Sequence, residues 1–213
     1  MPNHVTNILE GSKEILDSLR LGENDIDFNT IIPMPDGLAG VTAWSDAESE
    51  AKRVIAHGGE LKRDNVKSDD SFEAAKQMLA NYKACGFTHW YPWSCENWGT
   101  KWNAYSTERR EDNVLKFETA WSAPHDIITT LSKKHPEVEF VHKWADEDTG
   151  HNLGERKYLN GEFNENLHED DPVRFALSIT PEYADYYKED PDTGKMVHKS
   201  DDEIDEMEAQ QED

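Results

Sequence analysis

The apolar and polar positions at the start of the chain predict a strand, a helix and a second strand. Residues 4–10 place apolar side chains among polar neighbours, as a short strand does, and Gly11 ends this strand. Ser12 can cap a helix whose apolar positions share one face, with Gly22 as its expected end. Residues 27–33 predict a second strand, which prolines close. This part of the chain therefore predicts the order β-α-β.

A second β-α-β unit is predicted further along the chain. Residues 114–121 alternate, and one face of this strand carries Leu115, Phe117, Thr119 and Trp121. Pro124 suits the first turn of a helix that Pro136 ends. Residues 138–144 predict another strand, with His142 among its apolar positions.

The two units are separated by residues 40–90, which predict a helical insertion. A capping-box spacing begins one helix at Ser45. A second helix opens at Asp70 or Ser71 and ends at Gly86, and its apolar residues recur at helical spacing.

The C-terminal part of the chain begins with a hairpin signal. Asn160-Gly161 supplies the two positive φ angles of a type I′ turn, so a hairpin is expected to extend the sheet. Residues 173–179 alternate as a strand would, although Asp171-Pro172 could begin a helix, and we expect the strand. Thr180-Pro181-Glu182 predicts the start of a short helix.

These elements together predict an α+β fold, namely a ferredoxin-like split β-α-β sandwich with a helical insertion and an added β-hairpin. We expect this domain to cover residues 1–180 and a short helix and linker to cover residues 181–199. Residues 200–213 carry eight acidic residues and no basic one, which predicts a disordered acidic tail.

The charged residues are distributed unevenly along the chain. The 213 residues carry a formal net charge of −23, from 45 acidic and 22 basic residues. Residues 72–134, however, carry a net charge of +1 and contain five of the seven tryptophans. Acidity of this degree argues against direct binding to nucleic acid or to an anionic membrane, because phosphates require clustered Lys and Arg.

The chain has the sequence features of a cytoplasmic protein. It has no apolar run of about 18 residues, and its first residues lack the basic and apolar regions of a secretory signal. Two cysteines, Cys85 and Cys95, are too few for a disulfide framework. We therefore expect a cytoplasmic protein with two reduced thiols.

The segment from Asn97 to Tyr105 is the most informative for binding chemistry. If it is extended, Lys101, Asn103 and Tyr105 share one side and Trp98 faces the other. The polar triplet could bind an anionic or amide-bearing group. Alternatively, the tryptophans pin a loop to the sheet and the polar side chains bond to backbone groups.

Two further polar residues belong to this candidate ligand site. Asn7 lies on the same strand face as Val5 and Leu9, so it needs hydrogen-bond partners if that face is buried. Glu118 could lie beside Lys101. The pair could be part of a small site with Asn7, or it could be one satisfied ion pair.

Other candidate chemistry is weaker, and we expect neither a metal nor a cofactor. Asp146-Glu147-Asp148 with His151 could ligate a cation, but Lys157 stands where a calcium loop requires Glu, so a hydrated turn is expected. Three further residues, Cys85, His89 and Cys95, lack zinc-site spacing. Cys95 could pair with the remote His125 as a nucleophile, but nothing local supports this. No P-loop or dinucleotide motif is present, and no catalytic residue is assigned.

Several strings in order carry a resemblance to a known family. They are PNHVTN (2–7), DFN (27–29), IPMP (32–35), NWGTKWNAY (97–105), FETAWSAP (117–124) and ADE (145–147). The chain resembles, over residues 2–165, the YubB-like family of conjugative plasmids and bacteriophages, whose domain is described as ferredoxin-like. Ala123 stands where a second proline is expected, and Asp146 stands where Glu is expected. The resemblance implies an accessory protein of a phage or plasmid that acts in a bacterial cytoplasm, with no settled activity.

Two functional hypotheses follow. The first is a non-enzymatic acidic interaction protein that binds and modulates a host nucleic-acid-binding or defence protein, whose basic surface the carboxylates would occupy. Its expected partner-binding residues are the tail carboxylates Asp201, Asp202, Glu203, Asp205 and Glu206. The alternative is a small-ligand binding domain or enzyme that takes a nucleotide or anionic metabolite in the cleft from Trp98 to Tyr105. Single-strand binding by exposed tryptophans is a third possibility, which the surrounding charge opposes.

Overall fold

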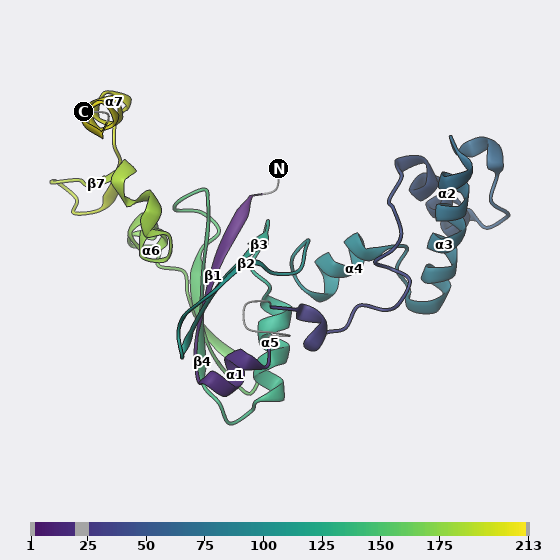
Figure 1. Cartoon of the computed structure of the whole chain (residues 1–213), viewed down its shortest axis with the longest axis horizontal. Coiled ribbons are helices and arrows are strands. Elements are labelled where there is room, and N and C mark those ends of the chain that lie inside the picture. The colour runs from purple at the N-terminus through teal and green to yellow at the C-terminus, as the bar shows by residue number, and fades with distance from the viewer. Residues whose placement is uncertain (1–2, 20–25, 212–213) are drawn as a thin grey trace.

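The computed structural model describes residues 3–19 and 26–211, and it centres on a six-stranded antiparallel sheet (Figure 1). The strand order is β2-β3-β1-β4-β5-β6. The strands span, in chain order, β1 His4–Glu10, β2 Tyr105–Glu111, β3 Val114–Ala120, β4 Phe140–Asp146, β5 Gly154–Leu159 and β6 Glu162–Asn166. Strand β3 lies between β1 and β2, and β1 lies between β3 and β4. Each β-α-β unit is therefore split by a strand of the other, which confirms the ferredoxin-like α+β prediction.

Helices cover both faces of the sheet. Helices α1 (Lys13–Asp17) and α5 (His125–Lys134) pack on one face, over a core that includes Leu9, Phe117 and Phe140. Helix α6 (Pro172–Ile179) covers part of the other face, where Ile8 and Ala145 are buried against it (Figure 1). No helix in the described part of the chain is long and apolar enough to cross a membrane.

The second strand of the first unit is not where the sequence predicted it. Residues Phe28–Thr30 form a 3₁₀ turn, η1, in which the Asp27 side chain accepts a hydrogen bond from the Asn29 N–H at 2.9 Å. Phe28 and Ile31 are both buried at the three-residue spacing of a helix. The strand of this unit is instead β2, which begins only at Tyr105, and it is absent from the sequence prediction. The expected helix end, Gly22, lies outside the described residues.

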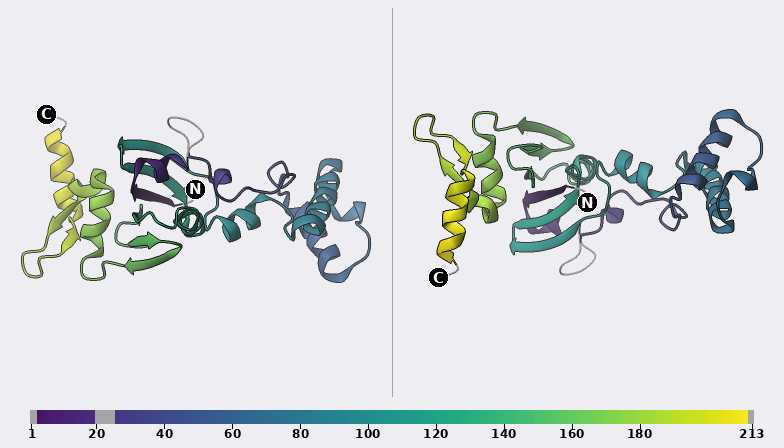
Figure 2. Two further views of the ribbon diagram at one scale, coloured as in Figure 1. Left: turned by 90° about the horizontal axis from the view of Figure 1, so that it is seen from below. Right: turned by 90° about the horizontal axis from the view of Figure 1, so that it is seen from above.

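The helical insertion is confirmed and projects from the sheet (Figures 1 and 2). It contains α2 (Ser45–His57), a turn η2 (Arg63–Asn65) and α3 (Asp69–Cys85), and a further helix that the sequence did not predict, α4 (Trp90–Asn97), follows them. Helix α3 begins at Ser68, whose hydroxyl caps it, and ends at Gly86 in the left-handed conformation. The predicted capping box at Ser45 is wrong by one residue, because Trp44 precedes the helix without a side-chain cap.

A buried carboxylate fastens α2 to the η2 loop. Glu50 is 3 % exposed, and its two oxygens accept hydrogen bonds of 2.7–2.8 Å from Arg53, the Lys62 N–H and Asn65. The Arg53 guanidinium, helped by the bonds from Asn65 and Lys62, lowers the pKa of Glu50 to about 2 despite its burial. The insertion thus has a polar anchor beside its own small apolar core of Val41, Ala47, Ala51, Ala75 and Met78.

The region after β4 confirms the hairpin and corrects the prediction for residues 173–179. Asn160 and Gly161 have φ angles of 53° and 78°, so the I′ turn joins β5 to β6 as expected. Residues 173–179 form α6 rather than a strand. The Asp171 side chain caps this helix through the Arg174 N–H, and Pro172 fits its first turn.

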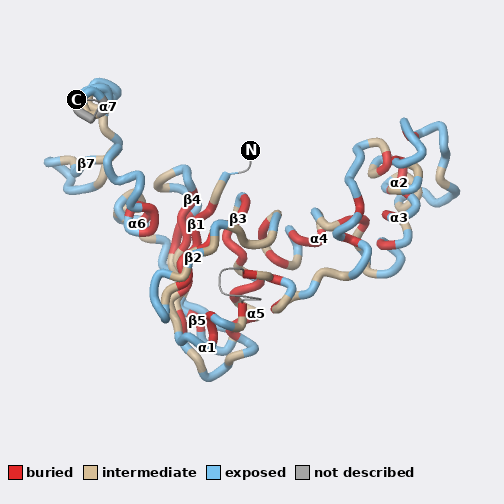
Figure 3. The backbone as a smooth tube through the Cα atoms, in the orientation of Figure 1, coloured by how far each residue is buried: buried red, intermediate tan, exposed pale blue. Residues whose placement is uncertain are grey.

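The acidic tail is helical rather than disordered over its described part. After η3 (Pro181–Tyr186), β7 (Tyr187–Glu189) and β8 (Met196–His198) form a small hairpin, followed by α7 (Asp201–Gln211). Ser200 and Glu203 form a reciprocal capping box, and Lys188 pairs with Glu203 at 2.6 Å. These contacts fix the first turn, although most of the helix surface is exposed (Figure 3).

Candidate functional site

An unpaired ammonium group lies among exposed aromatic rings at one end of the sheet. The Lys101 Nζ atom is 4.3 Å from the ring centroid of Trp121, 4.6 Å from that of Trp102 and 6.0 Å from that of Tyr91. The three aromatic residues are 43 %, 38 % and 37 % exposed, respectively. Among residues 3–19 and 26–211, no carboxylate lies within ion-pair distance of Lys101. We call these four residues the Lys101 patch.

Three separate elements bring the patch together. Tyr91 comes from α4, Lys101 and Trp102 come from the loop before β2, and Trp121 follows β3. Gly99 allows this loop to turn, with a φ of 75°. Trp121 has the same φ, which strains a bulky residue, and its backbone N–H is held by the carbonyl of Asn3 at 2.9 Å. Strain of this kind clusters at functional sites and costs about 1–3 kcal/mol.

A chain of buried hydrogen bonds supports the turn that carries Trp121. The Asn7 Nδ2 group donates to the Thr119 hydroxyl at 2.9 Å and to a backbone carbonyl, so its Oδ1 accepts from His142 Nε2 at 3.0 Å. Thr119 in turn donates to the Ser122 carbonyl, and the Ser122 hydroxyl donates to the Gly99 carbonyl at 2.6 Å. Asn7 is therefore a positioning residue for the patch, and it does not reach the surface.

The sequence-predicted polar triplet is only partly exposed for binding. Asn103 is occupied by the Phe28 and Ala104 N–H groups and by Asp27, to which it donates at 2.7 Å. Burial raises the pKa of Asp27, but the hydrogen bonds from Asn29 and Asn103 outweigh this and the net pKa is lowered. Of the triplet, only Lys101 places a charged group over the rings of the patch, and Tyr105 contacts Trp102 edge to face, with ring centroids 6.4 Å apart.

Tyr105 is likewise engaged within the fold. Its hydroxyl donates to the Thr119 carbonyl at 3.1 Å, so it accepts from His4 Nδ1 at 2.7 Å. Burial, with smaller contributions from Glu118 and Glu147, raises the pKa of Tyr105 to about 12. The expected pair between Lys101 and Glu118 is not formed, because Glu118 has no ion-pair partner within the described ranges.

Trp98 belongs to the core, and a small pocket opens beside it. Its indole N–H donates to the Ile32 carbonyl at 2.9 Å, and its ring contacts those of Phe28 and Trp93. The adjacent pocket has a volume of about 250 Å³, and its lining includes Met34, Trp90, Lys101 and Trp102. The Lys101 patch therefore borders a cavity as well as open surface.

Two residues of the patch, Tyr91 and Trp121, were not predicted from the sequence. The tryptophan-rich, near-neutral segment is the signal that could have suggested them. Spacing could not do so, because α4 and the end of β3 meet only in the folded chain. Tyr91 and Trp121 contact each other edge to face, with ring centroids 6.0 Å apart.

The other sequence candidates serve local structure. His89 caps α4 by accepting from the Tyr91 N–H, and the Cys85 thiol donates to the Asn81 carbonyl. Asp146 is buried and accepts hydrogen bonds from Asn3, the Asp148 N–H and Asn152. Within the described residues, no group of three or more His, Cys, Asp or Glu side chains is arranged to hold a metal ion.

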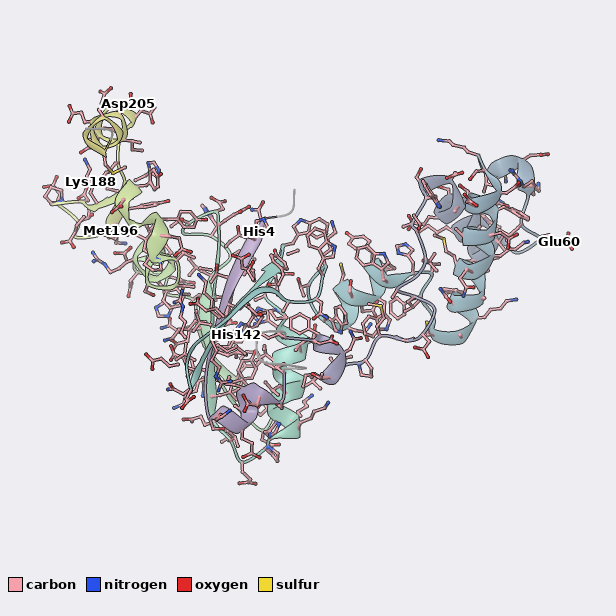
Figure 4. All side chains as sticks on the ribbon, viewed as in Figure 1. His4, Glu60, His142, Lys188, Met196 and Asp205 are labelled. Carbon is pink, nitrogen blue, oxygen red and sulfur yellow. The ribbon has the colours of Figure 1, made fainter. Side chains whose placement is uncertain are left out.

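A fully buried histidine and a half-buried one lie close together beside the sheet, and the sequence offered only His125, as a remote partner for Cys95. His142 is fully buried near the middle of the sheet (Figure 4), and its ring lies 5.8 Å from that of His125. Burial, and secondarily the charge of Arg156, lowers the pKa of His125 to about 4. Burial also lowers the pKa of His142 well below its usual value, with His125 as the next cause.

These histidines predict a loss of stability in mild acid. Their pKa values are lower in the folded chain, so protonation favours the unfolded chain, and stability is lost as the pH falls below about 6.5. His125 alone should reduce the free energy of unfolding by about 2 kcal/mol between pH 7 and pH 5. Urea titrations at the two pH values measure the free energy of unfolding. In His125→Gln, the loss of about 2 kcal/mol that His125 causes should be absent. An unchanged free energy of unfolding would contradict the prediction.

Comparison with known proteins identifies the family. A family model described as the ferredoxin-like domain in Api92-like protein matches residues 101–213. The crystal structure of a protein api92 from Yersinia pseudotuberculosis is similar at 12 % identity, covering 78 % of this chain and 98 % of that chain, with a TM-score of 0.41. No curated protein matches. These comparisons do not extend to the YubB-like name or to a phage or plasmid origin. The chain belongs to the family defined by the ferredoxin-like domain in Api92-like proteins.

Proposed function

We propose that the chain is a non-enzymatic binding module whose Lys101 patch takes an anionic group carried on a flat ring, the chemistry of a nucleotide. The observation that carries this proposal is the Lys101 ammonium, which lies over the rings of two partly exposed tryptophans and has no carboxylate partner among the described residues. An anion would supply the missing counter-charge.

The two parts of such a ligand would use different groups of the patch. A nucleobase stacks on an aromatic side chain with about 1–3 kcal/mol per base, and Trp102 and Trp121 each expose a ring. The phosphate would pair with Lys101. The chain as a whole carries a charge of −23 and repels anions, so binding is expected only where the local charge is near neutral.

Replacing Lys101 with methionine should weaken the binding of adenosine monophosphate by about tenfold or more. The matched control is Lys76→Met, because Lys76 also lies over an aromatic ring, at 4.8 Å from the Phe72 centroid, but on α3 of the insertion. Calorimetric titration measures both. Equal affinities for the wild-type chain and Lys101→Met, or no binding to the wild-type chain, would contradict the proposal.

The helical structure of the acidic tail, α7, favours a second candidate function. This helix exposes Asp201, Asp202, Asp205 and Glu206, whereas Glu203 is used internally by Lys188 and Ser200. An ordered row of carboxylates can occupy a basic surface of a partner protein. In the phage or plasmid setting that the sequence resemblance implies, that partner would be a host nucleic-acid-binding or defence protein.

A variant of α7 in which the exposed carboxylates are replaced by amides tests this second function. The variant D201N/D202N/D205N/E206Q should lose most of the salt-sensitive binding of a lysine-rich peptide, because exposed charges act through screened attraction. Fluorescence anisotropy at low and high salt measures the loss. Binding that is unchanged in the variant would count against α7 as the contact surface.

A further inference from the structure

The two edges of the sheet are protected to very different degrees. On β2, the pairing with β3 is interrupted by register shifts after Tyr105 and after Arg109, and Ser106 has a positive φ. Arg109 also forms an ion pair with Asp17 of α1, with 2.7 Å between the guanidinium nitrogen and the carboxylate oxygen. Irregularity and charge of this kind are how natural edge strands avoid pairing with other chains.

Strand β6, at the opposite edge, lacks the register shifts of β2, and its only charged side chains are the carboxylates of Glu162 and Glu165. Its sequence, EFNEN, contains no lysine or proline, and all five residues are exposed. Its pairing with β5 runs without a register shift from Leu159↔Glu162 to Glu155↔Asn166. Across residues 3–19 and 26–211, β6 pairs with β5 alone. The outer side of β6 therefore offers a regular row of backbone groups.

Hairpin geometry identifies which backbone groups face outward. A two-residue turn closes on a hydrogen-bonded pair, here Leu159 and Glu162, and such pairs then alternate along an antiparallel ladder. Glu162, Asn164 and Asn166 thus bond to β5. The N–H and C=O groups of Phe163 and Glu165 are directed away from β5, where a further strand would meet them.

Hollows flank β6 at both ends and provide room for side chains of an added strand. One, of about 370 Å³, is lined by Leu159, Glu162 and Phe163 among others. A second hollow, of about 760 Å³, is lined by Glu165 and Glu169 among others. Leu159 and Phe163 are 46 % and 43 % exposed, respectively. Backbone pairing with pockets for alternate side chains is the mode of β-strand addition.

The carboxylates near β6 indicate which kind of segment could pair with this strand. Glu165 is paired with Arg156, at 2.7 Å, and Glu139 is paired with Lys157. Glu162 and Glu169 have no ion-pair partner within the described ranges. A second copy of the chain would bring the same carboxylates and a further net charge of −23 to this edge, which opposes self-association. A segment with Lys or Arg side chains would instead supply the missing partners.

We propose that β6 receives an extended, basic segment of a partner protein as a seventh strand of the sheet. Backbone bonds to Phe163 and Glu165 provide the pairing, and Glu162 and Glu169 favour Lys or Arg at the flanking positions. This contact is separate from the Lys101 patch and from α7. It therefore does not rest on either function proposed above.

The experiment uses a short peptide of alternating lysine and valine, titrated into the full chain. Phe163→Lys and Glu162→Lys should each weaken binding by about tenfold, because they place lysine on the edge as natural guarded strands do. Glu108→Lys, the same charge change on the guarded edge β2, should have little effect. The variant D201N/D202N/D205N/E206Q should bind the peptide as the wild-type chain does at high salt.

A change in the peptide tests the pairing without any change in the protein. Methylation of alternate backbone amides removes the donors that strand addition requires, so it should abolish binding. Equal binding of the methylated peptide, or an equal loss with Glu108→Lys, would overturn the proposal, because either result indicates charge attraction without pairing. Loss of binding in the α7 variant would assign the contact to α7 instead. A dimer of the wild-type chain that Phe163→Lys dissolves would identify a second copy as the occupant.

Discussion

Replacing Glu50 with alanine is expected to destabilise the helical insertion by about 3–5 kcal/mol, the usual cost of removing one partner from a buried ion pair. The alanine would leave the Arg53 guanidinium, the Lys62 N–H and Asn65 without their common acceptor. Hydrogen exchange of the α2 and α3 amides measures the change. The matched control is Glu73→Ala on α3, whose exposed pair with Lys76 should contribute less than about 1 kcal/mol.

The pH dependence of the same variant checks the cause. The pKa of Glu50 is lowered in the folded chain, so its contribution is complete above about pH 4.5 and is lost as the pH falls toward about 2. The difference in stability between the wild-type chain and Glu50→Ala should therefore shrink in acid. A difference below about 1 kcal/mol at neutral pH, or one that does not change with pH, would refute the anchoring role.

Asn7→Ala is expected to cost about 1–3 kcal/mol of global stability, because it leaves the buried His142 Nε2–H group without a partner. It also removes one of the two hydrogen bonds of the Thr119 hydroxyl, which keeps its bond to the Ser122 carbonyl. The substitution should also weaken ligand binding at the Lys101 patch, since the chain from Asn7 through Thr119 and Ser122 supports the loop at Gly99. Chemical denaturation and the calorimetric titration measure the two effects.

The control and the coupling test for Asn7 use residues of the same sheet. Asn164→Ala, at an exposed position of β6, should change stability by less than about 0.5 kcal/mol. A double-mutant cycle of Asn7→Ala with Thr119→Val should give a clear coupling energy. Strictly additive effects would show that the two side chains do not act as one network.

Sequence analysis located the strands that have buried positions or a marked turn, and it missed β2, which has neither. Strand β3 alternates between buried and half-buried positions, so its pattern matches its environment. Strand β2, YSTERRE, is an edge strand with no apolar alternation, and therefore it gives no signal. Residues 173–179 alternate in sequence, yet the Asp171 cap and the apolar cluster around Ile8 favour a helix.

The candidate site was found in part because its composition is unusual, whereas its geometry depends on contacts that are distant in the sequence. Lys101 was placed in an extended segment with Asn103, but Gly99 turns this loop and Asp27 draws Asn103 away. Trp121 was expected on the face of Leu115, and its positive φ turns it outward instead. A single residue with an unusual backbone angle can reverse a prediction that rests on alternation.

The central claim is that the Lys101 patch is a binding surface, and nuclear magnetic resonance of the indole N–H groups tests it most directly. During titration with adenosine monophosphate, the signals of Trp102 and Trp121 should shift most. The signal of Trp44, which is exposed at the start of α2 in the insertion, should stay in place. Signals that all remain unchanged, or that shift equally for Trp44, would contradict the claim.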